Sequence, residues 1–102
     1  MITKETLPQI QERLKKEILL MDGAMGSLFQ TYKFEEKDFR GTRFPNPPVP
    51  LKGNFDLLNL TQPDAVREIH RRYLDAGADI IETNTFNANR ISQAEFQLQD
   101  LA

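Results

Sequence analysis

The sequence has no cysteine and no tryptophan, and a single histidine stands among its 102 residues. Without cysteine the chain has no disulfide, no thiol nucleophile and no redox motif. With one histidine and no cysteine, a complete zinc site cannot be built from this chain.

A large excess of one charge and long apolar stretches are also missing. Lysine and arginine number 13 against 15 aspartate and glutamate, so no extended basic surface is available for a phosphate backbone, and we expect no nucleic-acid partner. The composition, with 39% hydrophobic residues, predicts no membrane span. Residues 1–5 lack the apolar core of a secretory signal, which favours a cytoplasmic location.

The first part of the chain predicts a helix and then a strand. Apolar residues at helical spacing indicate a helix over about 7–17: Leu7, Ile10 and Leu14. Thr6 and Gln9 match a capping box at its start. The continuous apolar run 18–21 that follows predicts a strand covered on both faces, as in a parallel sheet.

Residues 23–59 predict a long loop. Helix and central strand are forbidden in part of it by a cluster of prolines: Pro45, Pro47, Pro48 and Pro50. Phenylalanines interleaved with charges indicate that the loop packs locally. A connection of this length is usually functional or disordered, and the aromatic residues favour a functional loop. A short helix is compatible with residues 26–31.

Regular structure resumes after the loop. Thr61 and Pro63 match a helix start, which predicts a helix over 63–76 that ends at Gly77 in the left-handed conformation. Residues 79–83 predict a second strand, and helical spacing returns from residue 92. Strand, helix and strand in this order indicate parallel neighbours and an α/β fold class.

Two parallel strands alone would leave an open edge on each side. We therefore expect residues 1–102 to be the N-terminal fragment of a larger α/β domain, truncated at its C-terminal end. The alternative is a stand-alone module that binds a small amino acid or a protein partner and buries its open edges by self-association.

The strongest local motif is DGAMGS at residues 22–27, directly after the first predicted strand. Its glycines allow a sharp turn whose backbone N–H groups form an anion-binding concavity, and Asp22 is suited to bind a ligand ammonium group. The alternative is an Asx turn, in which Asp22 bonds its own backbone and Gly23 supplies a positive φ. Spacing alone favours the turn.

A second candidate segment, residues 82–89, follows the second predicted strand. Thr83, Asn84 and Phe86 offer hydrogen-bonding groups and an aromatic ring to a small polar ligand. A polar loop that caps the next helix through Asn89 or Ser92 fits the segment equally well.

The other polar residues give no site. His70 borders the apolar face of the second predicted helix, and we interpret it as a packed, hydrogen-bonded structural residue. Asp38, Asp56 and Asp79 do not have the spacing of metal ligands. We predict no metal site and no catalytic residue in this chain.

Three ordered segments together resemble the start of a homocysteine S-methyltransferase domain. They read DGAMGS at 22–27, GNFDLLNLT at 53–61 and IHRRYLDAGADIIETNTF at 69–86. The resemblance covers about residues 14–102. The second segment, with the aromatic and proline-rich stretch before it, points to the cobalamin-dependent branch of the family.

The resemblance implies a (β/α)8 TIM barrel, incomplete in this chain, with homocysteine bound at the carboxyl ends of the strands. In that family a zinc ion held by three cysteines binds the homocysteine thiolate, which attacks the methyl group of methylcobalamin. The resemblance implies that Asp22, Gly23 and Ala24 bind the polar end of homocysteine. It places three further substrate-binding residues beside this site: Thr83, Asn84 and Phe86.

The family's zinc cysteines lie in later strands, and this chain has no cysteine. The resemblance therefore implies that zinc and cobalamin bind to other parts of a complete enzyme. It also implies that the fragment alone is inactive.

Overall fold

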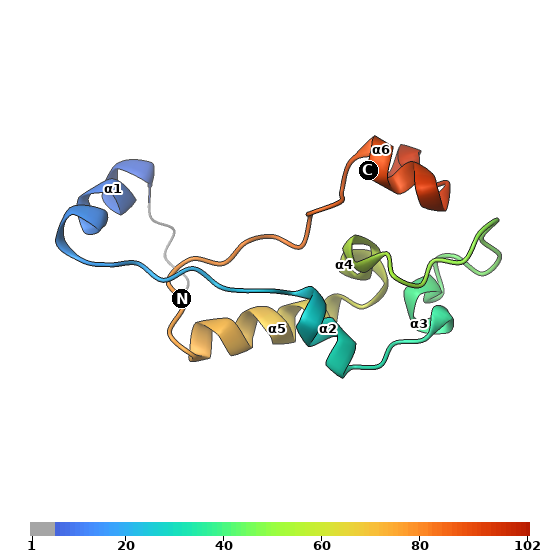
Figure 1. Cartoon of the computed structure of the whole chain (residues 1–102), viewed down its shortest axis with the longest axis horizontal. Coiled ribbons are helices and arrows are strands. Elements are labelled where there is room, and N and C mark those ends of the chain that lie inside the picture. Colours follow the sequence, from blue (N-terminus) through green and yellow to red (C-terminus); the bar gives the residue numbers. More distant parts are fainter. Residues whose placement is uncertain (1–5) are drawn as a thin grey trace.

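A computed structural model of the chain describes residues 6–102, so the prediction made from residues 1–5 lies outside the described part. The molecule is elongated, with extents of 51 × 26 × 24 Å and a radius of gyration of 16.3 Å. A compact domain of about 100 residues has a radius of gyration of about 13 Å. Figure 1 shows α1 at one end, joined by an extended segment to the remaining helices.

Every regular element within residues 6–102 is helical. The α-helices are α1 (Leu7–Lys16), α2 (Gly26–Thr31), α3 (Glu36–Arg40), α4 (Leu58–Thr61), α5 (Pro63–Asp75) and α6 (Arg90–Gln93). Three short 3-10 helices accompany them: η1 (Phe55–Leu57), η2 (Ala94–Phe96) and η3 (Gln99–Leu101). No described helix has the length and apolar character needed to cross a membrane.

The predicted α/β fold, with strands at 18–21 and 79–83 as the first βα units of a TIM barrel, is wrong for this structure. The two segments run side by side but share one isolated parallel bridge, between Met21 and Ile80. Figure 1 shows them meeting there and diverging toward α2 and α6.

Side-chain carboxylates explain why no sheet forms between the two segments. The Ile80 amide donates to the Leu20 carbonyl over 3.0 Å, and the Asp22 amide donates to the Ile80 carbonyl over 2.9 Å. On either side of these two main-chain hydrogen bonds, a side-chain carboxylate accepts the hydrogen bond of the next amide along the chain. Asp79 accepts from Leu20 N over 3.0 Å, and Asp22 accepts from Glu82 N over 3.1 Å. These amides are therefore not available to extend a main-chain ladder.

Most of the apolar core lies in the region predicted as the long loop 23–59. That region contains α2, α3, η1 and α4, and α2 has the bounds of the short helix considered at 26–31. The core residues come from these helices, from α5 and from the turn before η1: Phe29, Phe39, Leu51, Leu57, Leu58, Val66 and Ile69. Phe29 and Phe39 therefore belong to the same core as the buried residues of α5.

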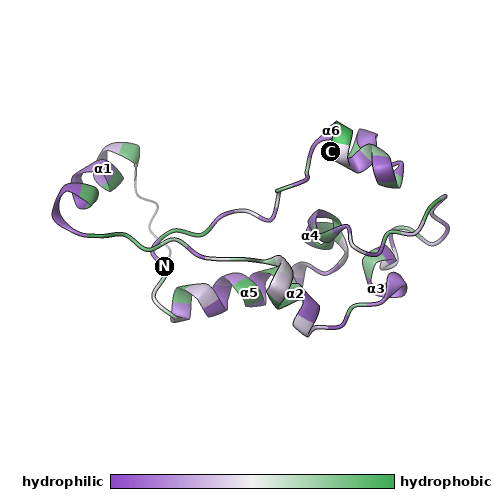
Figure 2. Cartoon of the chain, viewed as in Figure 1, coloured by the Kyte–Doolittle hydropathy of each residue, from purple (hydrophilic) through white to green (hydrophobic). Residues whose placement is uncertain are grey.

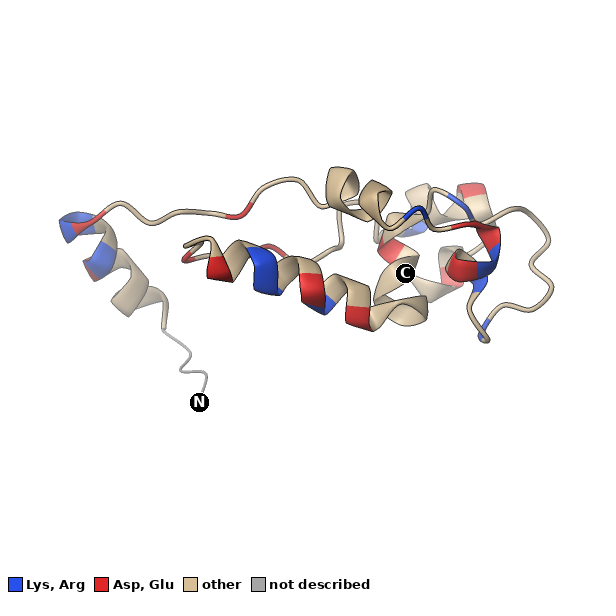
Figure 3. Cartoon of the chain, turned by 90° about the horizontal axis from the view of Figure 1, so that it is seen from below, with Lys and Arg blue, Asp and Glu red and all other residues tan. Residues whose placement is uncertain are grey.

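Helix α5 carries the core on one side and charges on the other. Val66 and Ile69 are buried, and acidic and basic positions follow one another along the helix in Figure 3. Gly77 follows the helix with φ +107°, the left-handed stop expected there. The predicted helix from 92 is instead the short α6, which begins at Arg90 and gives way to 3-10 turns.

The extended segments leave apolar side chains in contact with solvent. Ile18 is 87% exposed, and Leu20 and Met21 are each 55% exposed. Figure 2 shows this stretch as a hydrophobic part of the ribbon outside the helical core. Helix α1 has no buried residue, although its capping box, Thr6 with Gln9, is formed.

Candidate functional site

All six residues predicted to bind substrate line one pocket of about 310 Å³. One wall is the turn that leads into α2, with Asp22, Gly23 and Ala24. The opposite wall is the segment after the Met21–Ile80 bridge, with Thr83, Asn84 and Phe86. Two segments about 60 residues apart in the sequence therefore meet at the place where the extended pair diverges.

Asp22 joins the two walls of this pocket. Its Oδ2 accepts the Glu82 amide over 3.1 Å, so the carboxylate reaches across the pocket. Within the described residues no group donates to the other oxygen, Oδ1, which is left to accept a further hydrogen bond. The Asx-turn alternative required a bond to the local backbone, and the observed partner lies on the other segment instead.

Gly23 is needed for a different reason from the one predicted. It is not among the residues with positive φ. A Cβ atom at Gly23 would lie 3.1 Å from the Tyr73 hydroxyl oxygen. That hydroxyl donates to the Ala24 carbonyl over 2.7 Å, which ties the turn to α5. Glycine therefore allows the close approach of Tyr73.

The second wall combines one structural residue with exposed ones. Asn84 is buried, and its Nδ2 donates to the Phe55 carbonyl over 2.8 Å. The hydroxyl groups of Thr83 and Thr85 lie 2.7 Å apart. Phe86 is 93% exposed, so its ring is available to cover a ligand. Asn89 also caps α6, because its Oδ1 accepts the Ser92 amide over 2.8 Å.

Phe55 and Asp56 form a third wall of the pocket, and neither residue was predicted to bind substrate. The Asp56 carboxylate accepts the Asn87 amide over 2.7 Å. From the sequence, Asp56 was considered only as a possible metal ligand. Its hydrogen bond with a residue 31 positions later cannot be seen in local sequence patterns.

The charge of the pocket is negative. Three carboxylates line it, from Asp22, Asp56 and Glu82, and no lysine, arginine or histidine among the described residues does so. Such a lining attracts a cationic group and disfavours an isolated anion. An ammonium group that also needs hydrogen-bond acceptors is well matched to it.

The described residues do not assemble a metal site. No group of three or more histidine, aspartate or glutamate side chains within residues 6–102 could hold an ion. The carboxylates considered as ligands accept backbone hydrogen bonds instead: Asp38 from Glu35, Asp56 from Asn87 and Asp79 from Leu20. Among residues 6–102 the buried Nδ1 of His70 finds no hydrogen-bond partner, in contrast to the hydrogen-bonded structural role predicted for it.

A family model described as homocysteine S-methyltransferase matches residues 19–102. The match covers most of the 102-residue chain and takes in every residue that lines the acidic pocket. The matched family consists of methyltransferases that act on homocysteine. We conclude that this chain belongs to the homocysteine S-methyltransferase family.

Proposed function

We propose that the acidic pocket binds the amino-acid end of homocysteine. The observation that carries the proposal is the Asp22 carboxylate, which is fixed by Glu82 through one oxygen and keeps the other for a ligand. In this proposal Asp22 Oδ1 accepts a hydrogen bond from the homocysteine ammonium group. The surrounding carboxylates of Asp56 and Glu82 add to the attraction.

The remaining groups of the pocket suit the rest of an amino acid. The turn at Gly23 and Ala24 exposes backbone to the pocket, where amides can receive the ligand carboxylate. The exposed ring of Phe86 can cover the aliphatic part of the side chain. No catalytic residue is assigned to this chain, so its role in the proposal is substrate binding.

We further propose that the complete enzyme is a cobalamin-dependent methionine synthase, which methylates homocysteine to methionine. Zinc does not fit the side chains of this chain, because it has no cysteine and its described carboxylates form no metal cluster. We therefore assign zinc and cobalamin to residues outside this chain and expect no methyl transfer by the chain alone. The match to the homocysteine family supports this proposal at the level of the substrate.

Binding of L-homocysteine to the 102-residue chain tests the pocket, with 4-mercaptobutanoate as the matched ligand that lacks the amino group. We expect Asp22→Asn to weaken L-homocysteine binding by about 1–3 kcal/mol and to leave 4-mercaptobutanoate unaffected. Asparagine keeps an acceptor for Glu82 N, so the fold is preserved. Asp64→Asn, on the exposed side of α5, is the control. Equal losses for both ligands would overturn the role of Asp22.

Self-association is a second candidate function, favoured by the exposure of large apolar side chains. Ile18, Phe86 and Ile91 are each at least 87% exposed. Burial of such side chains between two copies would be favourable. Sedimentation over a wide concentration range tests it, and a monomer at every concentration excludes it.

A further inference from the structure

A second pocket, of about 340 Å³, has Phe55 in common with the acidic pocket and is otherwise lined by different residues. It is bounded by the end of α2, by α3 and by the turn before η1. Four phenylalanines and two lysines dominate its lining: Phe29, Phe34, Phe39, Phe55, Lys33 and Lys52. In size it falls within the range of small-molecule sites.

The phenylalanines form a continuous aromatic surface. Phe29 and Phe55 are parallel, with ring centroids 5.7 Å apart, and the Phe39 centroid lies 6.0 Å from that of Phe55. Phe34 meets Phe39 nearly edge-on, at 83° and 6.4 Å. Phe29 and Phe39 are buried, whereas Phe34 and Phe55 are partly accessible. A flat ring could therefore contact the accessible aromatic surface of Phe34 and Phe55, with the buried rings behind it.

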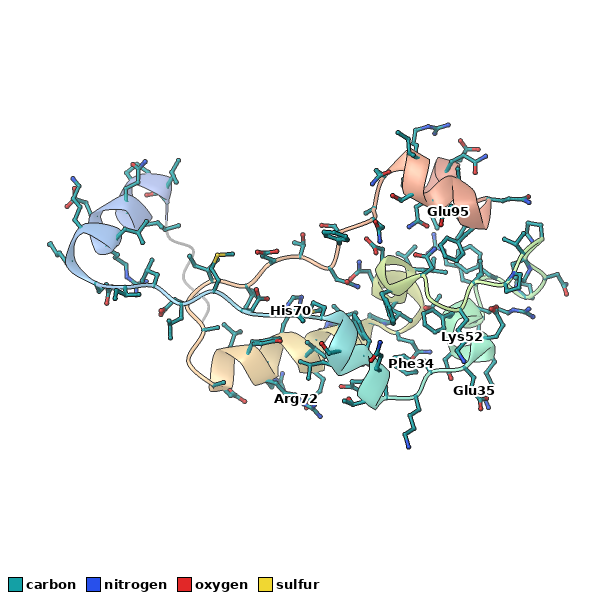
Figure 4. The ribbon with its side chains drawn as sticks, in the orientation of Figure 1. Phe34, Glu35, Lys52, His70, Arg72 and Glu95 are labelled. Atoms are coloured by element: carbon teal, nitrogen blue, oxygen red, sulfur yellow. The ribbon has the colours of Figure 1, made fainter. Side chains whose placement is uncertain are left out.

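Both charges at the rim are positive and unpaired. Among residues 6–102, neither Lys33 nor Lys52 has an ion-pair partner, and both side chains are exposed. Figure 4 shows Phe34, between α2 and α3, beside Lys52. Lys33 follows α2 with φ +55°, an unusual conformation for a residue with a side chain, and it brings the chain round to Phe34.

The two acidic residues of this stretch have basic partners of their own. Glu35 pairs with Lys37 over 3.7 Å, outside the pocket. Glu36 pairs with Arg40 over 2.7 Å and accepts the amides of Leu51 and Lys52. The two rim lysines therefore give this pocket a positive charge, opposite to that of the acidic pocket.

We propose that this aromatic-lysine pocket binds a planar aromatic carboxylate. The ring of the ligand stacks on the phenylalanine surface, and its carboxylate lies between the ammonium groups of Lys33 and Lys52. An aliphatic anion would lose the stacking, and an aromatic cation would be repelled by the lysines. This site shares Phe55 with the proposed homocysteine site but has different charged residues, and the proposal goes beyond that site.

The direct test is a titration of the 102-residue chain with 2-naphthoate, followed by amide chemical shifts. We expect a dissociation constant of about 1 mM, as is usual for a ligand of this size, with shifts concentrated around residues 29–34 and 52–55. The matched probes are 2-naphthylmethylammonium, which reverses the charge, and cyclohexanecarboxylate, which removes the aromatic ring. Binding of either as tight as that of 2-naphthoate would overturn the proposal.

Lysine substitutions at the rim test the charge without disturbing the core. We expect Lys33→Gln and Lys52→Gln each to weaken 2-naphthoate binding about two- to five-fold. Lys37→Gln is the matched control, because Lys37 lies on α3 and pairs with Glu35. A loss with Lys37→Gln equal to that with Lys52→Gln would show a general charge effect and overturn the site.

Phe34→Leu tests the aromatic surface, with an expected loss of about two- to ten-fold. The lysine variants keep the proposal falsifiable if this variant does not fold. Asp22→Asn should leave 2-naphthoate binding unchanged, which distinguishes this site from the homocysteine site. An equal loss of both ligands with Asp22→Asn would overturn the independence of the two pockets.

Discussion

Asn54 and Gln93 exchange two hydrogen bonds between buried side-chain amides 39 residues apart in the sequence. Asn54 Nδ2 donates to Gln93 Oε1 over 2.7 Å, and Gln93 Nε2 donates to Asn54 Oδ1 over 3.1 Å. The same Nε2 donates to the Asn87 carbonyl over 3.0 Å. This amide pair connects α6 with the turn before Phe55 and holds the end of the 82–87 wall.

Replacement of one partner of the amide pair should be costly. In Gln93→Ala the Asn54 amide stays buried without its partner, and we expect the free energy of unfolding to fall by about 1–3 kcal/mol. Urea denaturation measures the change. Gln11→Ala, on the exposed side of α1, should change stability by less than about 0.5 kcal/mol. Equal effects of the two variants would contradict the importance of the pair.

Gly23 and Tyr73 should be energetically coupled. Gly23→Ala places a Cβ atom 3.1 Å from the Tyr73 hydroxyl oxygen, and we expect a loss of about 1 kcal/mol. Tyr73→Phe removes that oxygen together with its bond to Ala24, at a cost of about 1 kcal/mol. The double variant should lose less than the sum, because the close contact is gone. A double-mutant cycle gives the coupling, and strict additivity would disprove it.

The stability of the chain should depend on pH through Glu36. Burial alone raises the pKa of this carboxyl, but the hydrogen bonds from Arg40 and from the Lys52 and Leu51 amides outweigh burial and hold the pKa below 4.5. A lowered folded-state pKa gives stability that is present above about pH 4.5 and is lost as the pH falls through the folded value.

Glu36→Gln tests this dependence. At pH 7 we expect a loss of about 1–2 kcal/mol, moderated by the partial exposure of the carboxylate. The difference from the wild type should shrink as the pH falls below 4.5, as measured by urea denaturation at a series of pH values. Glu12→Gln, which removes an exposed ion pair with Lys15, is the control. A difference that stayed constant with pH would be inconsistent with the lowered pKa.

Two glycines in open surroundings should respond to alanine in opposite directions. A Cβ atom at Gly77 or at Gly26 meets no heavy atom within 4 Å. Gly77 has φ +107°, so Gly77→Ala should cost about 1 kcal/mol. Gly26 begins α2 without a positive φ, so Gly26→Ala should stabilise by about 0.5 kcal/mol. Thermal unfolding measures both, and shifts of the same sign would refute the explanation.

Local patterns predicted the helices well where capping and periodicity act together. The predicted helices 7–17 and 63–76 lie at Leu7–Lys16 and Pro63–Asp75. The strands were wrong because Asp22 and Asp79 take amides that a sheet would need, and this contact joins segments about 60 residues apart. Periodicity within one segment cannot reveal such a bond.

The candidate site was predicted in part. The structure brings Asp22 and Thr83, with the four other predicted residues, to one pocket, and their binding role stays a prediction. Phe55 and Asp56 were missed because Asn84 and Asn87 hold them through long-range hydrogen bonds. The reason for Gly23 was also wrong, since only the packed position of Tyr73 shows it.

Helix α1 has ten residues and no buried side chain, so its stability rests on its capping box and on ion pairs such as Arg13 with Glu17. A helix of this length is marginal in water without tertiary burial. Its amide hydrogens should therefore exchange with solvent through local opening, at rates far above those of the amides of α5 around Ile69. We therefore expect the first helix to behave as a weakly protected unit, tied to the rest of the molecule by the ion pair of Arg13 with Asp79 at 3.8 Å.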